Sequence, residues 1–396
     1  MINIIGNILI FTDIHFGRNN NALNKLHVCN DVIDAIINDI KKQNIADVLF
    51  LGDWFHERDR VDVNTLNSAL KAIERLSKVC NLWLVVGNHD CYENDNTRVN
   101  SLNIFNAIKN VHVISDPTEV TINGELCLLA PWTTDFKKYK TGSFRAVLGH
   151  LDLPVHLLKD SYIQENLSNT KVSKIVEQEI DAILGDDIEY SDPKKTEQDE
   201  IDYTNEVIRV LDDNGIVMSG HIHSRSEKNI LGHTILFVGS PWHQTFGENK
   251  CDDGYYILNK DFSYEFHHLD TIPKMKEVYV SDIIEVGVDK FDYSVISGNT
   301  IKLVYDIIVD DVTVSNITTR IENNNPFEIS QPEYKAKPVN PVLSCGVIDD
   351  LRCGNLKFME DYLNREDVVG KIVSKKLDAG YILEILKESY NRVKDV

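Results

Sequence analysis

The sequence predicts an α/β protein whose chemistry lies at the carboxyl ends of its strands. In the first 90 residues, short apolar runs rich in β-branched residues alternate with amphipathic segments at helical spacing, as in parallel strands joined by helices. Several of these runs end in Asp, Asn or His, most of them after a glycine. The clearest is Leu84–Asp90, LVVGNHD, which turns at Gly87 into Asn88, His89 and Asp90. Strand ends of this kind are where open α/β sheets bind ligands.

Length and composition indicate a large core and more than one domain. The chain has 396 residues, of which 42% are hydrophobic, so two or three domains are expected. The net charge of −21 argues against a protein that coats DNA by bulk electrostatics. It does not exclude a nuclease, because a metal site needs carboxylates and its cations reverse the local field.

The cysteines and the apolar segments place the chain among cytoplasmic proteins. Seven cysteines are scattered without a CxxC pair, which predicts reduced thiols in the cytoplasm. The apolar start, Met1–His15, lacks a basic region and a cleavage site, so we expect a first strand rather than a signal peptide. No stretch is long enough to span a membrane, and no membrane association is expected.

The first two predicted strands each lead into candidate ligands. Ile8–Thr12 is followed by Asp13 and His15, which point the same way on an extended chain and could share one cation. The alternative for this pair is a surface turn. Val48–Leu51 leads to Asp53, which could bridge two cations or cap a helix.

The segments that follow these strands complete an alternating pattern. His56 could face a phosphate or base, or could simply pack. Val28–Lys42 and Thr65–Val79 have the apolar spacing of helices, and the second leads into the LVVGNHD strand. We therefore expect a sheet with parallel strands and right-handed crossovers.

The middle of the chain repeats the strand-end pattern with histidines. Ala146–Leu148 leads to Gly149 and His150, and Gly215–Met218 leads to Gly220, His221 and His223. Arg98–Ile108 is predicted to be helical. Further short strands are expected at Val111–Ile114, Val120–Ile122, Leu126–Ala130, Ile235–Val238 and Tyr255–Leu258.

Two charged segments are interpreted as surface structure rather than as binding sites. Phe136–Lys140 interleaves aromatic and basic residues and could hold a nucleic-acid backbone, but a surface loop is the favoured interpretation. Between Asp160 and Asp213 there are 16 acidic and 5 basic residues. We predict that this block, about 158–213, is a solvated insertion rather than a site.

The chain beyond about residue 270 carries no further candidate ligands. Residues 271–340 are expected to form a small α/β domain, with a strand at Lys302–Val309 and a helix at Val312–Ile321. Lys335–Val342 contains two prolines and is predicted to be a linker. Residues 341–396 therefore comprise the end of this linker and two amphipathic helices within Leu356–Val396. Their apolar faces need a partner, either the body of this protein or another chain.

Taken together, the strand ends predict a site for two metal ions. Mixed oxygen and imidazole ligands suit Mn²⁺, Fe²⁺ or Zn²⁺. Seven side chains are too many for one ion, whereas two ions about 3.5–4 Å apart could share a carboxylate and clamp a phosphate ester. The predicted ligands are Asp13, His15, Asp53, Asn88, His150, His221 and His223.

His89 is predicted to act on the substrate rather than on a metal. It adjoins the candidate ligand Asn88 and so points elsewhere on a turn, where it could protonate a leaving oxygen. The alternative is that His89 only orients a ligand.

These motifs resemble those of the calcineurin-type metallophosphoesterases. The resemblance covers about the first 270 residues and rests on DxH, GDxxxxR (Gly52–Arg58), GNHD, GH and GHxH in this order. A narrower resemblance is to SbcD-type DNA-repair nucleases and the recombination endonuclease subunits of large phages. It rests on the residues around Asp13 and Asp53, on Gly220–His223, and on Gly239–Trp242 with Phe246–Glu248.

The resemblance implies a four-layer β-sandwich flanked by helices in residues 1–270, and a role for each site residue. One Mn²⁺ would be held by Asp13, His15, Asp53 and His223, and the other by Asp53, Asn88, His150 and His221. His89 would be catalytic, and His56 would face the DNA and assist.

The resemblance also implies partners. Residues 271–340 would form a capping domain that recognises DNA, and the helices of 341–396 would bind an SMC-like ATPase of the SbcC type. A second copy of the chain is a further candidate partner. The acidic block has no counterpart in this comparison.

Three hypotheses follow. The first is a Mn²⁺-dependent exonuclease and single-strand endonuclease that works with an ATPase subunit. The second keeps the site but assigns it to small phosphate esters, and the chain after residue 270 argues against it. The third is a non-catalytic scaffold, against which the complete ligand set argues, because a scaffold is free to lose ligands.

Overall fold

The computed structural model describes residues 2–93, 96–153, 197–248 and 252–335. The chain divides into two compact units. The first comprises Met1–Val278, Asp292–Lys302 and Thr318–Gln331, and the second comprises Tyr279–Phe291, Leu303–Ile317 and Pro332–Val396. The predicted helices of 341–396 lie outside the described residues, as does the acidic block from 158 to 196.

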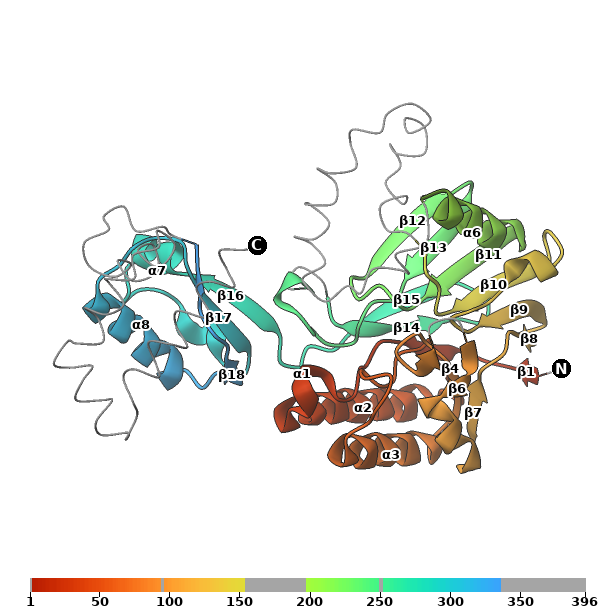
Figure 1. Ribbon diagram of the computed structural model, residues 1–396, viewed down its shortest axis with the longest axis horizontal. Helices are drawn as coiled ribbons and strands as arrows, with labels where there is room; N and C mark the ends of the chain where they lie inside the picture. The colour runs from red at the N-terminus through yellow and green to blue at the C-terminus, as the bar shows by residue number, and fades with distance from the viewer. Residues whose placement is uncertain (1, 94–95, 154–196, 249–251, 336–396) are drawn as a thin grey trace, which may run out of the picture. The chain divides into compact units, whose positions relative to one another are not determined.

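A six-stranded sheet forms one half of the framework of the first unit (Figure 1). Its order is β15-β14-β2-β3-β4-β7. Strands β2, β3, β4 and β7 run parallel, and β14 and β15 complete the sheet in antiparallel pairs. The strands are β2 (Ile8–Phe11), β3 (Asp47–Phe50), β4 (Asn81–Val85), β7 (Val111–Ile114), β14 (Gly254–Leu258) and β15 (Tyr264–His268).

A seven-stranded sheet forms the other half. Its order is β1-β8-β9-β10-β11-β13-β12, and the four strands β9, β10, β11 and β13 run parallel. The strands are β1 (Ile2–Ile4), β8 (Thr118–Ile122), β9 (Glu125–Ala130), β10 (Phe144–Gly149), β11 (Leu211–Ser219), β12 (Ser226–Ile230) and β13 (His233–Phe237).

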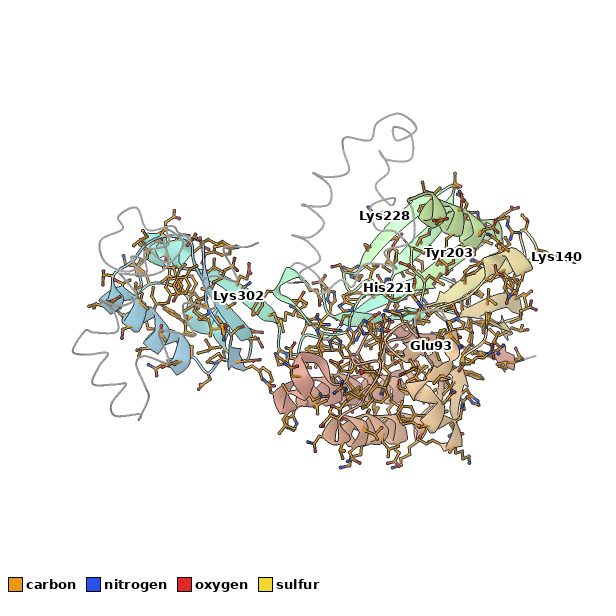
Figure 2. The ribbon with its side chains drawn as sticks, in the orientation of Figure 1. Glu93, Lys140, Tyr203, His221, Lys228 and Lys302 are labelled. Atoms are coloured by element: carbon orange, nitrogen blue, oxygen red, sulfur yellow. The ribbon has the colours of Figure 1, made fainter. Side chains whose placement is uncertain are left out.

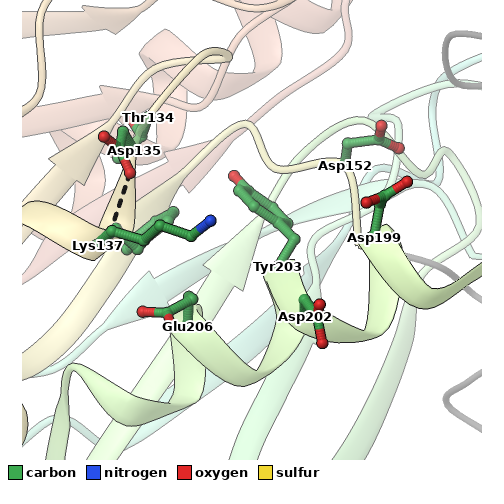
Figure 3. Close-up of a pocket in the computed structure, with 9 residues that line it drawn as sticks. Thr134, Asp135, Lys137, Asp152, Asp199, Asp202, Tyr203 and Glu206 are labelled. Carbon is green, nitrogen blue, oxygen red and sulfur yellow. Dashed lines mark hydrogen bonds between the residues drawn. The ribbon is translucent and has the colours of Figure 1, made fainter. Parts of the chain in front are cut away.

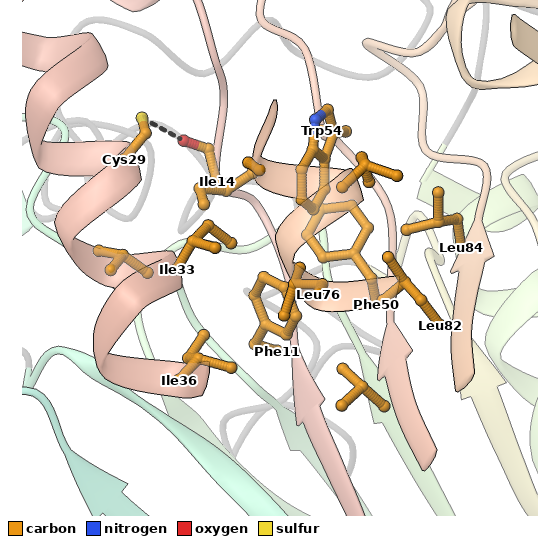
Figure 4. Close-up of a cluster of buried hydrophobic side chains, with 14 of the residues drawn as sticks. Phe11, Ile14, Cys29, Ile33, Ile36, Phe50, Trp54, Leu76, Leu82 and Leu84 are labelled. Carbon is orange, nitrogen blue, oxygen red and sulfur yellow. Dashed lines mark hydrogen bonds between the residues drawn. The ribbon is translucent and has the colours of Figure 1, made fainter. Parts of the chain in front are cut away.

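The alternation of side chains along β2 separates two apolar layers. Ile8 and Ile10 lie in the core between the two sheets, whereas Leu9 and Phe11 lie in the core that includes helices α2 (Leu23–Gln43) and α3 (Val63–Ser77). Figure 4 shows Phe11 and Phe50 packed among side chains of both helices. Because both faces of the strand are buried, its sequence is apolar throughout.

Helix α6 (Glu197–Arg209) covers the outer face of the seven-stranded sheet. Val207 and Ile208 are buried in a third apolar cluster with Val217 of β11 and Phe237 of β13. The first unit therefore has the layers helix, sheet, sheet, helix. The predicted α/β sandwich with flanking helices is confirmed.

The position of α6 corrects the interpretation of the acidic block as a solvated insertion over its whole length. The last part of that block, from 197 to 213, forms α6 and the start of β11. Asp202 is exposed, while Val207, Val210 and Leu211 are buried. In this described part of the block, exposed acidic side chains and buried apolar ones lie on different faces of an amphipathic helix.

The segment predicted as a helix at Arg98–Ile108 is different in the structure. It begins in strand β6 (Asn96–Asn100), which pairs with β5 (Cys91–Glu93), and continues as a 3₁₀ turn, η1 (Ser101–Ala107). The Asn100 side chain accepts a hydrogen bond from the Asn103 backbone N–H at 3.0 Å, which caps the turn.

The remaining described segments are short or lie after residue 274. Strand β17 (Thr300–Tyr305) is parallel to β18 (Glu328–Ile329) and β19 (Glu333–Tyr334) in a sheet that also contains β16 (Met275–Tyr279). The helical pieces are α1 (Arg18–Asn21), α7 (Val280–Val286), α8 (Asp311–Asn323), η2 (Phe136–Lys138), η4 (Phe246–Glu248) and η5 (Tyr293–Ile296). Among the helices of the described residues, none combines the length and the apolar character that crossing a bilayer requires.

Candidate metal centre

The predicted ligands lie together where strands of both sheets end. Each follows the carboxyl end of a parallel strand, and the two sheets face each other, so ends that are distant in sequence meet. Figure 2 shows His221 inside the first unit, close to where the sheets adjoin. The ligands follow β2 (Asp13, His15), β3 (Asp53), β4 (Asn88), β10 (His150) and β11 (His221, His223).

Asp13, His15 and His223 form one group of converging donors. The Nε2 atoms of His15 and His223 are 3.1 Å apart, and each lies 3.8 Å from Asp13 Oδ1. Asp13 Oδ1 is buried and accepts no hydrogen bond from the described residues. A buried carboxylate oxygen without a donor is costly, and a cation in this group would satisfy it.

Asn88, His150 and His221 form a second group. Asn88 Oδ1 lies 2.8 Å from His150 Nε2 and 3.2 Å from His221 Nδ1. With the amide rotated by 180°, its NH₂ group faces both rings and Asp53, and its oxygen accepts from Arg58 at 3.0 Å. In either orientation, one polar end of Asn88 points at the space that the two imidazoles share.

Asp53 lies between the two groups. Its Oδ2 atom is 3.6 Å from His15 Nε2 and 3.3 Å from His150 Nε2. Its other oxygen, Oδ1, accepts the backbone N–H of His89 at 2.8 Å. A single carboxylate oxygen thus faces one ring of each group, which is the position required of a ligand shared by two cations.

Asp53 and His150 shift each other's protonation. Burial lowers the pKa of His150, but the Asp53 carboxylate outweighs it and raises that pKa to about 9. Burial raises the pKa of Asp53, but the charges of His150 and His89 hold it well below the usual value. Since a metal needs the neutral imidazole, cation binding at His150 would release a proton.

His89 and His56 lie beside the first group. The Nδ1 atom of His89 is 2.7 Å from the carbonyl oxygen of His56, so it donates a proton there and leaves Nε2 for other contacts. The two rings stack with centroids 5.4 Å apart, and the ring of His15 is 4.8 Å from that of His89. Burial and the nearby Arg18 lower the pKa of His56 to about 3, so it is neutral at physiological pH.

Four of the seven predicted ligands have left-handed backbone. The φ angles of Asp13, His15, Asp53 and His221 are 51°, 49°, 64° and 77°. Non-glycine residues rarely adopt this conformation, which costs about 1–3 kcal/mol at each position unless the surroundings impose it. The strand ends are therefore held in a turn that aims the side chains inward.

Two glycines in the ligand loops are required by close packing. A Cβ on Gly87 would overlap the carboxylate and backbone nitrogen of Asp53. A Cβ on Gly220 would overlap the Thr12 hydroxyl and come within 2.8 Å of His150 Nδ1. The glycines that precede ligands in the sequence thus leave room for ligands from other strands.

Asp90 joins two of the ligand loops, a position that the sequence did not indicate. Its carboxylate is buried and accepts four backbone N–H groups, from Asp53, Trp54, Phe55 and Gly87, at 2.9 to 3.1 Å. These bonds tie the loop after β3 to the loop after β4. Burial and the charge of Asp53 raise the pKa of Asp90 to about 7, against the effect of the amides.

Glu248 and Gln244 also support the centre. Glu248 Oε1 is 3.1 Å from His223 Nδ1, and the side-chain amide of Gln244 donates to the carbonyl oxygen of Asp13 at 2.5 Å. The only signal in the sequence was the Phe246–Glu248 motif, which implied resemblance but no role. Burial raises the pKa of Glu248, but the His223 contact outweighs it and lowers that pKa.

A pocket of about 280 Å³ lies beside the second group (Figure 3). Asp152, which lines it, is 3.6 Å from His221 Nε2. The other lining carboxylates are those of Asp135, Asp199, Asp202 and Glu206. Because carboxylates outnumber the one lysine of this lining, Lys137, the pocket is unsuited to an anion.

The donor set fits divalent cations. Three groups of side chains have ligand atoms within 4.8 Å of one another, namely Asp13–His15–His223, Asp13–Asp53–His150 and His15–His56–His89. Imidazole with carboxylate and amide oxygens suits Mn²⁺, Fe²⁺ or Zn²⁺. An α/β sandwich with such ligands at its strand ends defines a metal-dependent hydrolase as the class of protein.

The chain belongs to the calcineurin-like phosphoesterase family, whose sequence profile matches residues 6–225. Members of this family use divalent metals, and membership indicates a metal-dependent phosphoester hydrolase. The expected resemblance to the calcineurin-type metallophosphoesterases is confirmed at this level.

Known proteins similar to the chain include two viral proteins named as phosphoesterases. Protein 244L of Invertebrate iridescent virus 6 is 27% identical over 263 residues, which cover 63% of this chain and 75% of that protein. Protein 078R of Invertebrate iridescent virus 3 is 23% identical and covers 85% of this chain and 87% of its own. An archaeal phosphodiesterase of known structure is 15% identical, with a TM-score of 0.31, and covers 66% of this chain and 99% of its own.

Proposed function

We propose that the chain is a Mn²⁺-dependent DNA nuclease, acting as a double-strand exonuclease and a single-strand endonuclease. The observation that carries this proposal is the position of Asp53 Oδ2, 3.6 Å from His15 Nε2 and 3.3 Å from His150 Nε2. A carboxylate shared between two donor groups is suited to two cations and to the hydrolysis of a phosphate ester.

In this mechanism the chain positions the substrate and moves one proton. Two bound divalent cations would supply charge neutralisation and an activated water. Asp53 holds the two groups of ligands together, and its Oδ1 fixes the backbone of His89 at 2.8 Å. Nδ1 keeps its proton on the His56 carbonyl oxygen, so His89 would act as the doubly protonated imidazolium, giving its Nε2 proton to the leaving oxygen and ending as the neutral Nδ1–H tautomer.

Two features favour a nucleic acid over a small ester. The partly exposed ring of Trp132 lies beside the centre, with its centroid 4.9 Å from that of His221, and an aromatic face is suited to stacking a base. The chain also extends well beyond its catalytic ligands, and a small-molecule enzyme has no evident need for residues 271–396. On the nuclease proposal His56 assists by facing the DNA.

We further propose that the chain works in an SbcCD-like repair or recombination complex. Residues 271–340 would recognise DNA, and the helices predicted in 341–396 would bind an SMC-like ATPase. Recruitment by the partner would also offset the net charge of −21, which opposes DNA binding by this chain alone. A second copy of the chain is a further proposed partner.

The decisive experiment compares substrates at fixed Mn²⁺. Purified chain, alone and with its ATPase partner, is incubated with linear duplex DNA, circular single-stranded DNA and a nitrophenyl phosphate ester. We expect cleavage of both DNAs that EDTA abolishes and Mn²⁺ restores. Ester hydrolysis without DNA cleavage, even with the partner present, would favour a small-molecule phosphoesterase. Loss of both activities would favour a scaffold.

The partner assignment has its own test. Removal of residues 341–396 should leave weak intrinsic nuclease activity but abolish co-purification with the ATPase. A truncated chain that still binds the ATPase would contradict the assignment.

A further inference from the structure

Glu248 is a buried carboxylate with a full set of contacts. It is 3% exposed. Its Oε1 atom lies 3.1 Å from His223 Nδ1 and 3.3 Å from the Thr245 hydroxyl, while Oε2 accepts the backbone N–H of Gln244 at 2.8 Å. A carboxylate removed from water needs such donors, and the imidazole of His223 is the one that leads to the centre.

The contact with Glu248 determines which nitrogen of His223 can bind a metal. An ionised carboxylate only accepts hydrogen bonds, so Nδ1 of His223 must carry the proton. The lone pair is then on Nε2, which faces Asp13 Oδ1 at 3.8 Å and His15 Nε2 at 3.1 Å. A carboxylate on the far nitrogen also makes the ring a more basic ligand.

Among the described residues, no carboxylate lies within hydrogen-bond distance of the outward-facing nitrogen of the other three candidate ligand histidines, His15, His150 and His221. The Nδ1 atom of His150 is 2.7 Å from the carbonyl oxygen of Leu51, which is a neutral acceptor. His221 Nε2 is 3.6 Å from Asp152, beyond hydrogen-bond distance. His15 Nδ1 has no hydrogen-bond partner among the described residues. Within the described chain, His223 therefore has the strongest anchor.

The loop that carries Glu248 also fixes Asp13. The side-chain amide of Gln244 donates to the carbonyl oxygen of Asp13 at 2.5 Å. Trp242 Nε1 donates to the next carbonyl oxygen, that of Ile14, at 2.9 Å. One loop thus positions two ligands of the same group, Asp13 through its backbone and His223 through its ring.

We propose that Glu248 is a positioning residue that holds His223 in a single tautomer and makes the Asp13–His15–His223 position the tighter of two metal positions. Two carboxylates, Asp13 and Glu248, serve this position, whereas Asn88, His150 and His221 contribute neutral donors to the other. Asp53 is shared and favours neither. The inference rests on the proposed function only in requiring that the centre binds two divalent cations.

The test is a titration of metal-free, full-length protein with Mn²⁺. Calorimetry measures the heat of binding, and electron paramagnetic resonance measures the free Mn²⁺ at each step. The wild type should show two classes of site. Glu248→Gln should weaken Mn²⁺ binding at the tighter class by roughly 10- to 100-fold. A glutamine side chain has a single acceptor oxygen, so it cannot accept from both the His223 ring and the backbone N–H of Gln244. The weaker class should keep its affinity.

A matched control distinguishes this effect from general damage. Asp253 is equally buried, at 3% exposure, but lies outside both groups of ligands. Asp253→Asn should leave both Mn²⁺ classes unchanged. Retention of the tighter class in Glu248→Gln, or equal weakening of both classes, would overturn the proposal. Absence of Mn²⁺ binding in the wild type would overturn the two-metal function as well.

A second measurement needs no variant at Glu248. Long-range ¹H–¹⁵N correlation of the Zn²⁺-loaded wild type reports which imidazole nitrogen is protonated, and His223→Gln identifies the signal. We expect the proton of His223 on Nδ1. A proton on Nε2 would overturn the proposal even if Glu248→Gln failed to fold.

Discussion

At the scale of single residues, substitution of His89 tests whether catalysis can be lost while metal binding is kept. Its backbone N–H donates to Asp53 Oδ1 at 2.8 Å, and its ring stacks on that of His56 and lies 4.8 Å, centroid to centroid, from that of His15. Because His89→Ala keeps the backbone contact, we expect a loss of hydrolysis of roughly 10²- to 10⁴-fold with unchanged Mn²⁺ content. Metal content by mass spectrometry and cleavage rates on DNA check this.

The contrary outcome for His89 is also informative. Its ring atoms lie within 4.8 Å of ligand atoms of His15 and His56. Loss of one Mn²⁺ per chain in His89→Ala would assign the ring to a metal and remove it from proton transfer.

Trp132 is the residue whose change should separate binding from chemistry. Its ring centroid is 4.9 Å from His221 and 5.8 Å from His150, and stacking of a base is worth about 1–3 kcal/mol. Trp132→Ala should therefore raise KM for single-stranded DNA about tenfold or more, with little change in kcat, as steady-state kinetics would reveal. Trp132→Phe keeps an aromatic face and should retain most of the affinity. An equal fall in kcat for both variants would argue against stacking.

The convergence of the seven candidate ligands was predictable because each lies within four residues of the end of a parallel strand. Asp90 and Glu248 were not assigned, for a physical reason. Asp90 acts on backbone N–H groups of two loops, and Glu248 acts on a ring 25 residues earlier in the chain. Neither relation leaves a spacing in the sequence, since both depend on how the loops pack.

At the scale of elements, the loop after β4 fits against the loop after β3 without spare room. A Cβ on Gly87 would overlap Asp53, and overpacking of this kind costs about 1–3 kcal/mol. We expect Gly87→Ala to lower the free energy of unfolding by this amount and to abolish binding of one Mn²⁺ or more. Urea denaturation in EDTA and Mn²⁺ titration measure the two effects.

Gly124 provides the matched control for Gly87. It has a φ of 94°, and a Cβ there meets no atom within 4 Å. Gly124→Ala should lower the free energy of unfolding by only about 1–2 kcal/mol, the cost of a left-handed backbone at a non-glycine residue. Mn²⁺ binding should be unchanged. Normal metal binding in Gly87→Ala would show that the loops adjust.

Some helices and strands were easier to predict from the sequence than others. Strands such as Ile8–Phe11 are buried on both faces and are apolar throughout, so their pattern is plain. Helix α6 was not predicted, because its exposed face is acidic and its apolar residues, such as Val207 and Ile208, are few. The segment after β5 begins as strand β6, whose pairing with β5 is a tertiary contact that helical spacing does not reveal, and continues as a 3₁₀ turn.

At the scale of the whole molecule, stability should depend on pH through Asp253. Asp253 Oδ1 is 3.3 Å from His243 Nε2, and burial raises its pKa to about 8. The pKa of an unfolded Asp is about 3.9, so the folded chain holds this proton more tightly. The protonated Asp253 contributes its full stabilisation below about pH 4. This stabilisation is lost as the pH rises to about 8, by up to about 1.4 kcal/mol per pH unit.

The prediction is that Asp253→Asn flattens this dependence. Urea denaturation in EDTA at pH 5 and pH 8 should show a larger gain in stability at pH 8, because the uncharged amide removes the cost of a buried carboxylate. The half-buried Asp252, which pairs with Arg225 at 3.3 Å, gives the control Asp252→Asn. A gain that is equal at both pH values would contradict the assignment.

The turned backbone at Asp13, His15, Asp53 and His221 has a consequence for any effort to engineer this scaffold. Glycine at any of these positions would relieve the backbone strain but remove a candidate metal ligand. Selection for thermal stability alone would therefore favour variants that have lost activity. Screens for hardier variants should hold these four positions constant and score turnover alongside melting.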